Sequence, residues 1–234
     1  MDKITRRELK SDHFALEVGH GVDYLGHHRS QIIRWGSIAL VAIILVVAIS
    51  WFRNYRRAER QEALASALQI QNSAVGPPQS EFALAYPSQA DKDKAMLKAF
   101  SDVATKYSDT DEGMIAEYSL GSIAADKGDM AQAEKRYKLV ADSASNAYAS
   151  LAKLSLAQVY QAQGKTTDAE NLVKSVMDHP TMLVSKEQAI IALAHLKASS
   201  NPQEARKLLE PLRASQRGAI SRAALSALGD LPQK

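Results

Sequence analysis

The sequence contains no cysteine. The chain therefore forms no disulfide bond, and it offers no thiolate as a nucleophile or as a metal ligand. It also lacks the Gly-x-Ser-x-Gly, His-Glu-x-x-His and phosphate-binding-loop motifs of common hydrolases, zinc proteases and nucleotide-binding proteins. From these absences we expect no enzymatic activity, no cofactor and no metal site.

A surplus of one charge is missing from most of the chain. From Arg53 to Lys234 there are 23 Lys and Arg residues against 21 Asp and Glu residues. Binding to nucleic-acid phosphates needs a clustered cationic surplus, so we expect no nucleic-acid partner. Thr and Val are scarce outside residues 35–52 while alanine is abundant, which favours helices over strands.

Hydrophobic residues, by contrast, form one long run from Trp35 to Phe52, WGSIALVAIILVVAISWF. These eighteen residues carry no charge, and as a helix they span about 27 Å, close to the roughly 30 Å hydrocarbon core of a bilayer. Nine of them are Ile, Leu or Val, and their summed free energy of insertion is about −3 to −5 kcal/mol. We predict a single membrane-spanning helix. A buried core helix is the alternative, but no other segment is apolar enough to surround it.

We expect this helix to be retained as an anchor. It is preceded by 34 residues, more than an ordinary signal leader, and no small-x-small cleavage site follows it. Its orientation stays open on charge alone. Two arginines lie shortly before the run and four shortly after it, so a literal positive-inside rule places the following domain in the cytoplasm. Long domains, however, often translocate regardless of their charge.

The residues after the run predict further helices. Residues 53–73 carry no helix breaker, so the spanning helix is expected to continue as a stalk. Gly76-Pro77-Pro78 ends it, residues 74–90 read as a loop, and a helix over 91–107 follows. The predicted division is a tail (1–34), a transmembrane helix (35–52), a stalk helix and loop (53–90) and a repeat domain (91–234).

Two other clusters are given structural interpretations. In the tail, His13, His20 and His27 recur every seven residues, so on a helix they lie about 10 Å apart, too far to share one metal ion. We interpret them as part of a solvated polar face. The acidic cluster at 109–112 precedes a predicted helix and is expected to cap its N-terminus.

Five columns of residues recur with a period of 36 in the last part of the chain. They are Leu120, Leu156 and Ala192; Gly128, Gly164 and Ser200; Ala133, Ala169 and Ala205; Tyr137, Val173 and Leu209; and Val140, Val176 and Leu212. Each copy is predicted to form a helix, a short turn and a second helix, such as 114–127 followed by 130–141. One such hairpin cannot bury its apolar face alone, so we expect the pairs to stack into an all-α solenoid.

These columns resemble the tetratricopeptide repeat. The first copy matches its small and large positions with Leu120-Gly121, Gly128-Asp129, Ala133 and Tyr137. The second copy matches nearly as well, whereas the third is degenerate, and the period of 36 exceeds the usual 34. The resemblance implies that helix 91–107 is the second half of an earlier unit whose first half is the stalk. It also implies that residues 218–229 form a terminal capping helix.

The whole layout of tail, anchor, stalk and degenerate repeats is similar to the ancillary SecYEG translocon subunit family. The resemblance covers about residues 30–234 and rests on architecture and repeat spacing. It implies a single-pass protein of the bacterial inner membrane, with a cytoplasmic N-terminus and a periplasmic C-terminal domain. Its implied partners are translocon subunits, periplasmic chaperones and exported polypeptides.

In this fold the first helix of each unit lines a concave groove. The predicted groove residues, spaced by 36 or close to those positions, are Tyr118, Leu154 and Ile190 in the inward column, flanked by Ser122 and Gln158 and by Gln161 and Lys197. An apolar stripe between uncharged polar groups suits a hydrophobic or extended polypeptide segment. Plain core packing of the inward column is the alternative. Related domains clamp a peptide's terminal carboxylate with Lys or Asn, and only Lys197 fits that role.

Two functions follow from these expectations. The first is an envelope adaptor that binds proteins near the export channel and assists the handling of exported chains. The second is a structural scaffold for an envelope or cell-division assembly, which binds through its convex face or through self-association. An enzyme is a third, weaker option that only the histidines of the tail support.

Overall fold

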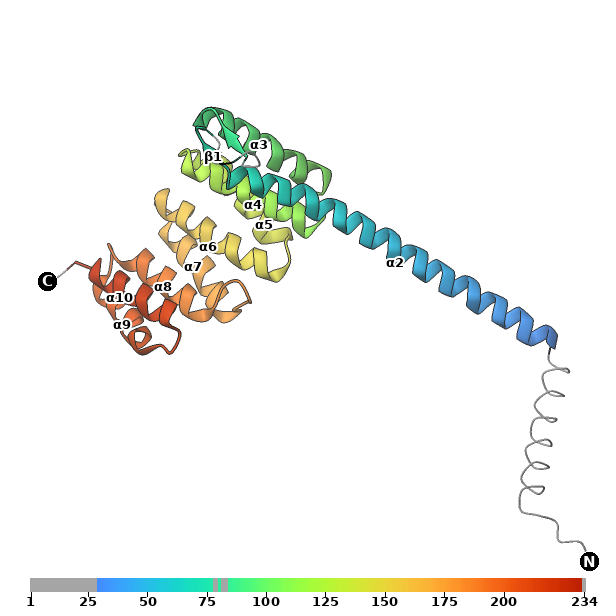
Figure 1. Cartoon of the computed structure of the whole chain (residues 1–234). Coiled ribbons are helices and arrows are strands. Elements are labelled where there is room, and N and C mark those ends of the chain that lie inside the picture. Colours follow the sequence, from blue (N-terminus) through green and yellow to red (C-terminus); the bar gives the residue numbers. More distant parts are fainter. Residues whose placement is uncertain (1–28, 78–79, 81–83, 233–234) are drawn as a thin grey trace, which may run out of the picture. The chain divides into compact units, whose positions relative to one another are not determined.

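The computed structural model describes residues 29–77, 80 and 84–232 (Figure 1). In chain order the elements are α2 (Arg29–Gln71), β1 (Ala74–Val75), β2 (Ala85–Tyr86), α3 (Gln89–Lys106), α4 (Asp111–Asp126), α5 (Met130–Ser143), α6 (Asn146–Ala162), α7 (Thr166–Asp178), α8 (Lys186–Lys197), α9 (Pro202–Leu209), the 3-10 helix η1 (Glu210–Ala214) and α10 (Gly218–Gly229). The expected all-α class is confirmed. The histidines His13, His20 and His27 lie outside the described residues.

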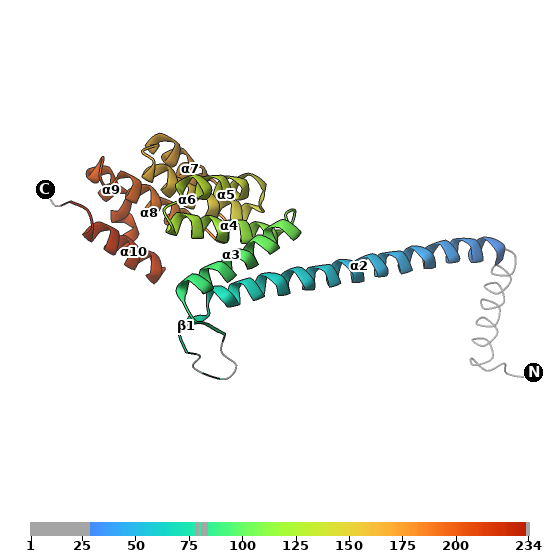
Figure 2. The same ribbon diagram turned by 90° about the horizontal axis from the view of Figure 1, so that it is seen from above.

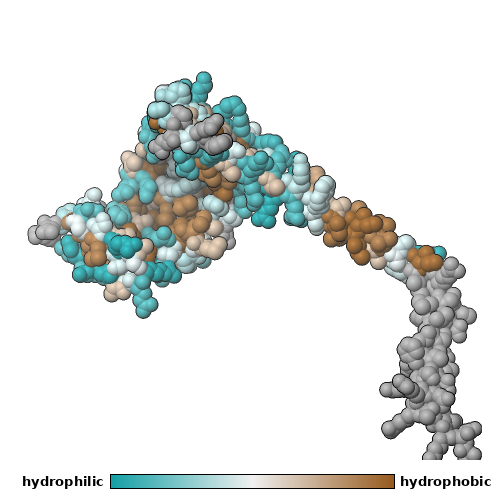
Figure 3. All heavy atoms as spheres, in the orientation of Figure 1, coloured by the Kyte–Doolittle hydropathy of each residue, from teal (hydrophilic) through white to brown (hydrophobic). Residues whose placement is uncertain are grey.

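The chain divides into two units, one that ends at Ala58 and one that begins at Glu59. In the first unit, α2 carries the apolar run, and its side chains from Ile33 to Arg57 are exposed. Figure 3 shows these hydrophobic side chains in brown along the N-terminal part of α2. Among the described residues, α2 is the one helix long and apolar enough to cross a membrane, and none of its apolar window is buried. The alternative of a buried core helix is therefore wrong.

The second unit begins inside α2, earlier than residue 91, where we placed the start of the repeat domain. Leu64 and Ala67 of α2 are buried in one cluster with Phe100 of α3 and Leu120 of α4. This packing explains the difference, because the end of α2 supplies one wall of the first core cluster. The end of α2 and α3 thus form a helix pair, as the repeat resemblance implies.

The remaining helices stack as three pairs, α4 with α5, α6 with α7, and α8 with α9, and each pair contacts the next (Figures 1 and 2). Most of these helices have an N-cap residue whose side chain accepts a hydrogen bond from a first-turn amide. The Thr110 side chain, for example, accepts from the Gly113 amide at 3.2 Å. The expected capping by the 109–112 cluster is confirmed for Thr110. Glu112 of the same cluster instead bonds Arg60 of α2 at 3.2 Å and is buried.

The turns within the pairs depend on glycine in two copies. Gly128 and Gly164 have φ angles of +78° and +76°, a left-handed conformation that glycine adopts without steric cost. The third copy has Ser200 at the equivalent position, and no described residue other than glycine has a positive φ. Its turn is longer by one residue and ends with Asn201, whose side chain caps α9.

Small residues let the paired helices approach closely. Ala133, Ala169 and Ala205 each have no exposed surface, and they lie in three successive core clusters. This complete burial is what a close approach of the two helices in each pair requires. At the C-terminal end α10 packs against α8, α9 and η1, and residues 218–229 form a capping helix as predicted.

The segment from Ala74 to Ala90 is not wholly a loop, contrary to our prediction. Strands β1 and β2 pair in parallel, with Ala74 opposite Ala85 and Val75 opposite Tyr86. Lys92 of α3 donates to the Ser73 carbonyl at 2.6 Å and so ties this connection to the helix that follows. Two residues per strand were too short to produce a detectable alternation in the sequence.

Candidate binding surface

The first helices of the three pairs lie next to one another, because α4 contacts α6 and α6 contacts α8. All seven predicted groove residues are on these three helices. The structure places six of them in three different surroundings: a hydrogen-bonded cluster between α4, α5 and α6, a hollow between α6, α7 and α8, and an ion-pair network at the end of α8. The seventh, Ile190, packs against the C-terminal core cluster.

Tyr118 and Ser122 belong to the hydrogen-bonded cluster. The Tyr118 hydroxyl lies 3.0 Å from the Ser155 hydroxyl of α6, and the Tyr137 hydroxyl donates to Ser122 at 3.0 Å. The rings of Tyr118 and Tyr137 lie 5.3 Å apart, and burial raises the pKa of the Tyr137 hydroxyl. Tyr118 is half-buried, so it contributes both to the packing of the α4–α5 pair against α6 and to the surface.

Leu154, Gln158 and Gln161 meet in a hollow of about 260 Å³. Its lining comes from α6, α7 and α8, and consists of Leu154, Ala157, Gln158, Gln161, Val173, Ala192, His195 and Leu196. Ala157, Val173 and Leu196 are buried and form an apolar floor, whereas the two glutamines and His195 are exposed and form a polar rim. No lining residue is a Lys, Arg, Asp or Glu, so the hollow suits an apolar group flanked by hydrogen-bonding groups.

His195 is the polar lining residue that sequence reasoning missed. The period of 36 pairs Gln158 with Ala194, but Ala194 is buried in the C-terminal core cluster, and the next residue, His195, reaches the hollow. Ile190 also differs from its predicted place in the groove, because it packs against this C-terminal cluster and does not line the hollow. The shortness of α8, twelve residues against seventeen in α6, accompanies this change of register.

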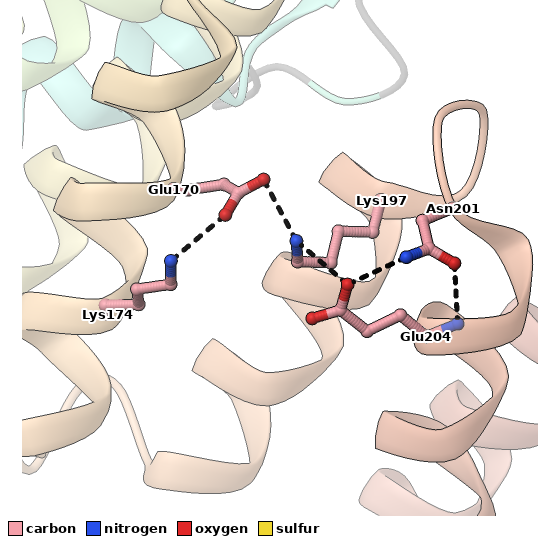
Figure 4. Close-up of polar contacts among 5 residues, drawn as sticks. All are labelled: Glu170, Lys174, Lys197, Asn201 and Glu204. Atoms are coloured by element: carbon pink, nitrogen blue, oxygen red, sulfur yellow. Dashed lines mark hydrogen bonds and ion pairs between the residues drawn. The ribbon is translucent and has the colours of Figure 1, made fainter.

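Lys197 lies in an ion-pair network (Figure 4). Its ammonium is 3.1 Å from Glu170 of α7 and 3.2 Å from Glu204 of α9, and only 13% of its side chain is exposed. Lys174 also bonds Glu170, and Asn201 bonds Glu204. The bond to Glu170 raises the pKa of Lys197, while the bonds from Lys174 and Lys197 lower the pKa of Glu170. A peptide carboxylate would have to displace these partners, so Lys197 serves chiefly to join α7, α8 and α9.

The described residues contain no group of three or more His, Asp or Glu side chains that could hold a metal ion. His179 and His195 thus stand apart from any such group, and the chemistry available at the hollow is hydrogen bonding and apolar contact.

Stacked pairs of helices with glycine turns and buried alanines define a helical repeat protein of the kind that binds other proteins. The chain belongs to the tetratricopeptide repeat-like domain family, whose model matches residues 30–211. Domains of this family are typically protein-binding modules without catalytic activity. No curated protein and no solved structure matches the chain.

Proposed function

We propose that this protein is a membrane-anchored adaptor that binds protein segments with its repeat unit near the Sec translocon. The observation that supports it most directly concerns α2. The same helix contains an apolar run without a buried side chain and, further on, Leu64 and Ala67 of the repeat core. Residues of α2 thus belong both to the proposed anchor and, further along the chain, to the repeat core.

A bilayer is the environment that suits the run from Trp35 to Phe52. Its large side chains are about half to three-quarters exposed, among them Trp35 at 70% and Trp51 at 73%. In water this exposure would cost the hydrophobic free energy of nine aliphatic side chains, whereas in lipid it is favourable. Aromatic residues at both ends fit the two headgroup regions.

The hollow between α6 and α8 is the proposed contact for partners. An extended polypeptide with an apolar side chain can place that side chain on Leu154 and Ala157, while its backbone meets Gln158, Gln161 and His195. Tyr118, Ser122, Ile190 and Lys197 then flank the contact on the neighbouring first helices. Because one anchor holds the unit at the membrane, even weak binding becomes effective through a local concentration in the millimolar range.

The cellular setting rests on the similarity in layout to the ancillary translocon subunits. On this proposal the protein is in a bacterial inner membrane, residues 1–34 are cytoplasmic and the repeat unit is periplasmic. Its partners are translocon subunits, periplasmic chaperones and exported polypeptides.

A topology experiment tests the setting. Alkaline phosphatase fused after Lys234 should be active, because the enzyme matures only outside the cytoplasm, and a fusion after Arg34, which lacks the span, should be inactive. Added protease should reach the repeat unit only after the outer membrane has been opened. If the fusion after Lys234 is inactive and the repeat unit is protected from protease, the unit lies in the cytoplasm and the export role is refuted.

One observation favours the alternative function, a scaffold. A second hollow of about 540 Å³ lies between α3, α4 and α5 and is lined by residues that include Leu139, Lys135 and Lys138. Leu139 is 44% exposed, so this side of the second helices can also hold a partner. A photocrosslinker at Leu139 that captures one fixed neighbour, with none captured from Gln158, would support the scaffold over the adaptor.

A further inference from the structure

The side chains at the C-terminal end of the apolar run of α2 and just beyond it are arranged in an order of increasing polarity. Ser50 ends the aliphatic part, and the rings of Trp51, Phe52 and Tyr55 come next. Arg53, Arg56 and Arg57 lie among and beyond these rings, and the chain has no Asp or Glu between Trp35 and Ala58. We call these three arginines the arginine belt.

Contacts along the helix hold the rings and the arginine belt together. Trp51 and Tyr55, one turn apart, are stacked with their ring centroids 6.4 Å apart. The guanidinium of Arg56 lies over the Phe52 ring at 6.0 Å. Arg53 and Arg57 are also one turn apart, and neither forms an ion pair with a described residue. All these side chains are exposed.

The height of the arginine belt fits a lipid headgroup layer. From Arg53 to Arg57 the helix rises about 6 Å. The polar layer on each side of a bilayer is about 5–8 Å thick, since it accounts for the difference between the total thickness and that of the hydrocarbon core. With the apolar run in the hydrocarbon, the arginine belt therefore lies at the level of the phosphates, and the rings lie at the boundary beneath it.

Arg60, the fourth arginine after the run, has a different role. Its guanidinium bonds Glu112 of α4 at 3.2 Å, and only 25% of its side chain is exposed. Glu59 likewise bonds Lys106 at 2.8 Å. Arg60 is thus partly buried in the second unit, whereas Arg53, Arg56 and Arg57 are exposed, and this separates the arginine belt from the cation that stabilises the fold.

We propose that Arg53, Arg56 and Arg57 form a binding site for anionic phospholipids of the phosphatidylglycerol class. A guanidinium matches a phosphate with two parallel hydrogen bonds and remains charged at any physiological pH. The site rests on the proposed membrane anchor, and it holds whichever side of the membrane the repeat unit occupies. It selects the lipids that surround this end of α2.

The two tryptophans of the chain make the site measurable. They lie at opposite ends of the run, so Trp35→Phe leaves Trp51 beside the arginine belt as the only tryptophan. The full-length variant is placed in vesicles in which either phosphatidylglycerol or phosphatidylcholine carries brominated, fluorescence-quenching chains. We expect Trp51 to be quenched preferentially by brominated phosphatidylglycerol, with an enrichment of at least about tenfold, since each arginine contributes about fivefold before repulsion and screening reduce the total.

Three controls test whether the arginine belt causes the preferential quenching by phosphatidylglycerol. Replacing all three arginines with Gln in the Trp35→Phe variant should remove the preference, with the helical circular dichroism unchanged because these side chains are exposed. Replacing them with Lys should keep part of it, because the charge remains and the paired hydrogen bonds are lost. Raising the salt concentration should weaken it.

The outcomes separate this inference from the anchor on which it rests. If both brominated lipids quench Trp51 equally, the helix is in the bilayer and the anionic site is refuted. A preference that survives the Gln substitutions also refutes the site. If neither lipid quenches Trp51, the run is not in the bilayer, and the membrane anchor fails together with the site.

Discussion

Gly121 shows at the residue scale how closely the helices of a pair approach. A Cβ atom at this position would lie 2.9 Å from two ring carbons of Tyr137 on the neighbouring helix. The ring is held by its hydroxyl, which donates to Ser122, and by its contact with Tyr118. We expect Gly121→Ala to lower the free energy of unfolding by about 1–3 kcal/mol through overpacking. Urea unfolding followed by circular dichroism measures this change.

Two other glycines calibrate that result. Gly229 has nothing within 4 Å of an added Cβ atom, so Gly229→Ala should be close to neutral. At Gly113 the added atom would overlap the backbone carbonyl of Tyr107, which cannot rotate away as a ring can. Gly113→Ala should therefore be the most destabilising of the three. Equal stability of the Gly121 and Gly229 variants would contradict the close packing of α4 on α5.

Glu170 makes stability depend on pH. The hydrogen bonds from Lys174 and Lys197 lower its pKa below the ordinary value of 4.5. The unfolded chain therefore takes up this proton first on acidification, so the stabilisation is complete above pH 4.5 and is lost as the pH falls through the lower, folded pKa. The free energy of unfolding should fall less from pH 6 to pH 3 in Glu170→Gln than in the wild type.

A matched exposed pair serves as the control for this pH dependence. Lys98 and Asp102 lie one turn apart on α3 with side chains 77% and 65% exposed. Such surface pairs contribute little because water screens them. Asp102→Asn should therefore keep the wild-type pH dependence. If Glu170→Gln and Asp102→Asn behave alike, the ion pairs of Glu170 in Figure 4 do not contribute to the pH dependence of stability.

At the element scale, α2 has two roles along its length. Leu64 is 8% exposed and packs into the first core cluster, whereas Leu68, one turn later, is 36% exposed. We expect Leu64→Ala to lower the free energy of unfolding by about 2–5 kcal/mol, because it removes buried methyl groups and leaves a cavity. Leu68→Ala should cost well under half of that, measured in the same urea titration. Equal losses would mean that the end of α2 is not part of the repeat core.

Much of this element-scale organisation was predictable from the sequence. A period of 36 in small and large residues fixes the helix pairs, because Gly128 and Ala133 mark positions where only small side chains allow a tight turn or a close approach. The register of α8 was not predictable. Whether Ala194 or His195 faces the hollow depends on how α9, η1 and α10 pack against α8, and the third copy has lost the glycine that fixes the turn.

The ion-pair network was hidden for a related reason. Lys197 occupies a groove column by spacing, but its partners Glu170 and Glu204 come from two other helices and lie 27 and 7 residues away in the chain. Periodicity reports which face of a helix a residue occupies, and it says nothing of the side chains that the neighbouring helices bring there. The hollow at Leu154, Gln158 and Gln161 was predictable because all three lie on one face of a single helix.

At the scale of the whole molecule, the chain joins an apolar helix to a protein-binding repeat unit. If α2 anchors the unit as proposed, the tether replaces high affinity, because a partner that is already at the membrane meets the hollow at high local concentration. On the proposed function, Leu154 and its polar rim bind many segments that share an apolar side chain and release them quickly. This is the behaviour expected of an adaptor for chains in transit.

The most direct measurement of this account is site-specific photocrosslinking from the rim of the hollow. A photoreactive amino acid replaces Gln158 in one variant and Gln203 in the control, both exposed, the latter on α9 and outside the lining of the hollow. During export of a radiolabelled secretory protein in membrane vesicles, we predict crosslinks from position 158 to the exported chain and few from position 203. Equal yields from the two positions, or no crosslink to the exported chain from position 158, would contradict the adaptor role.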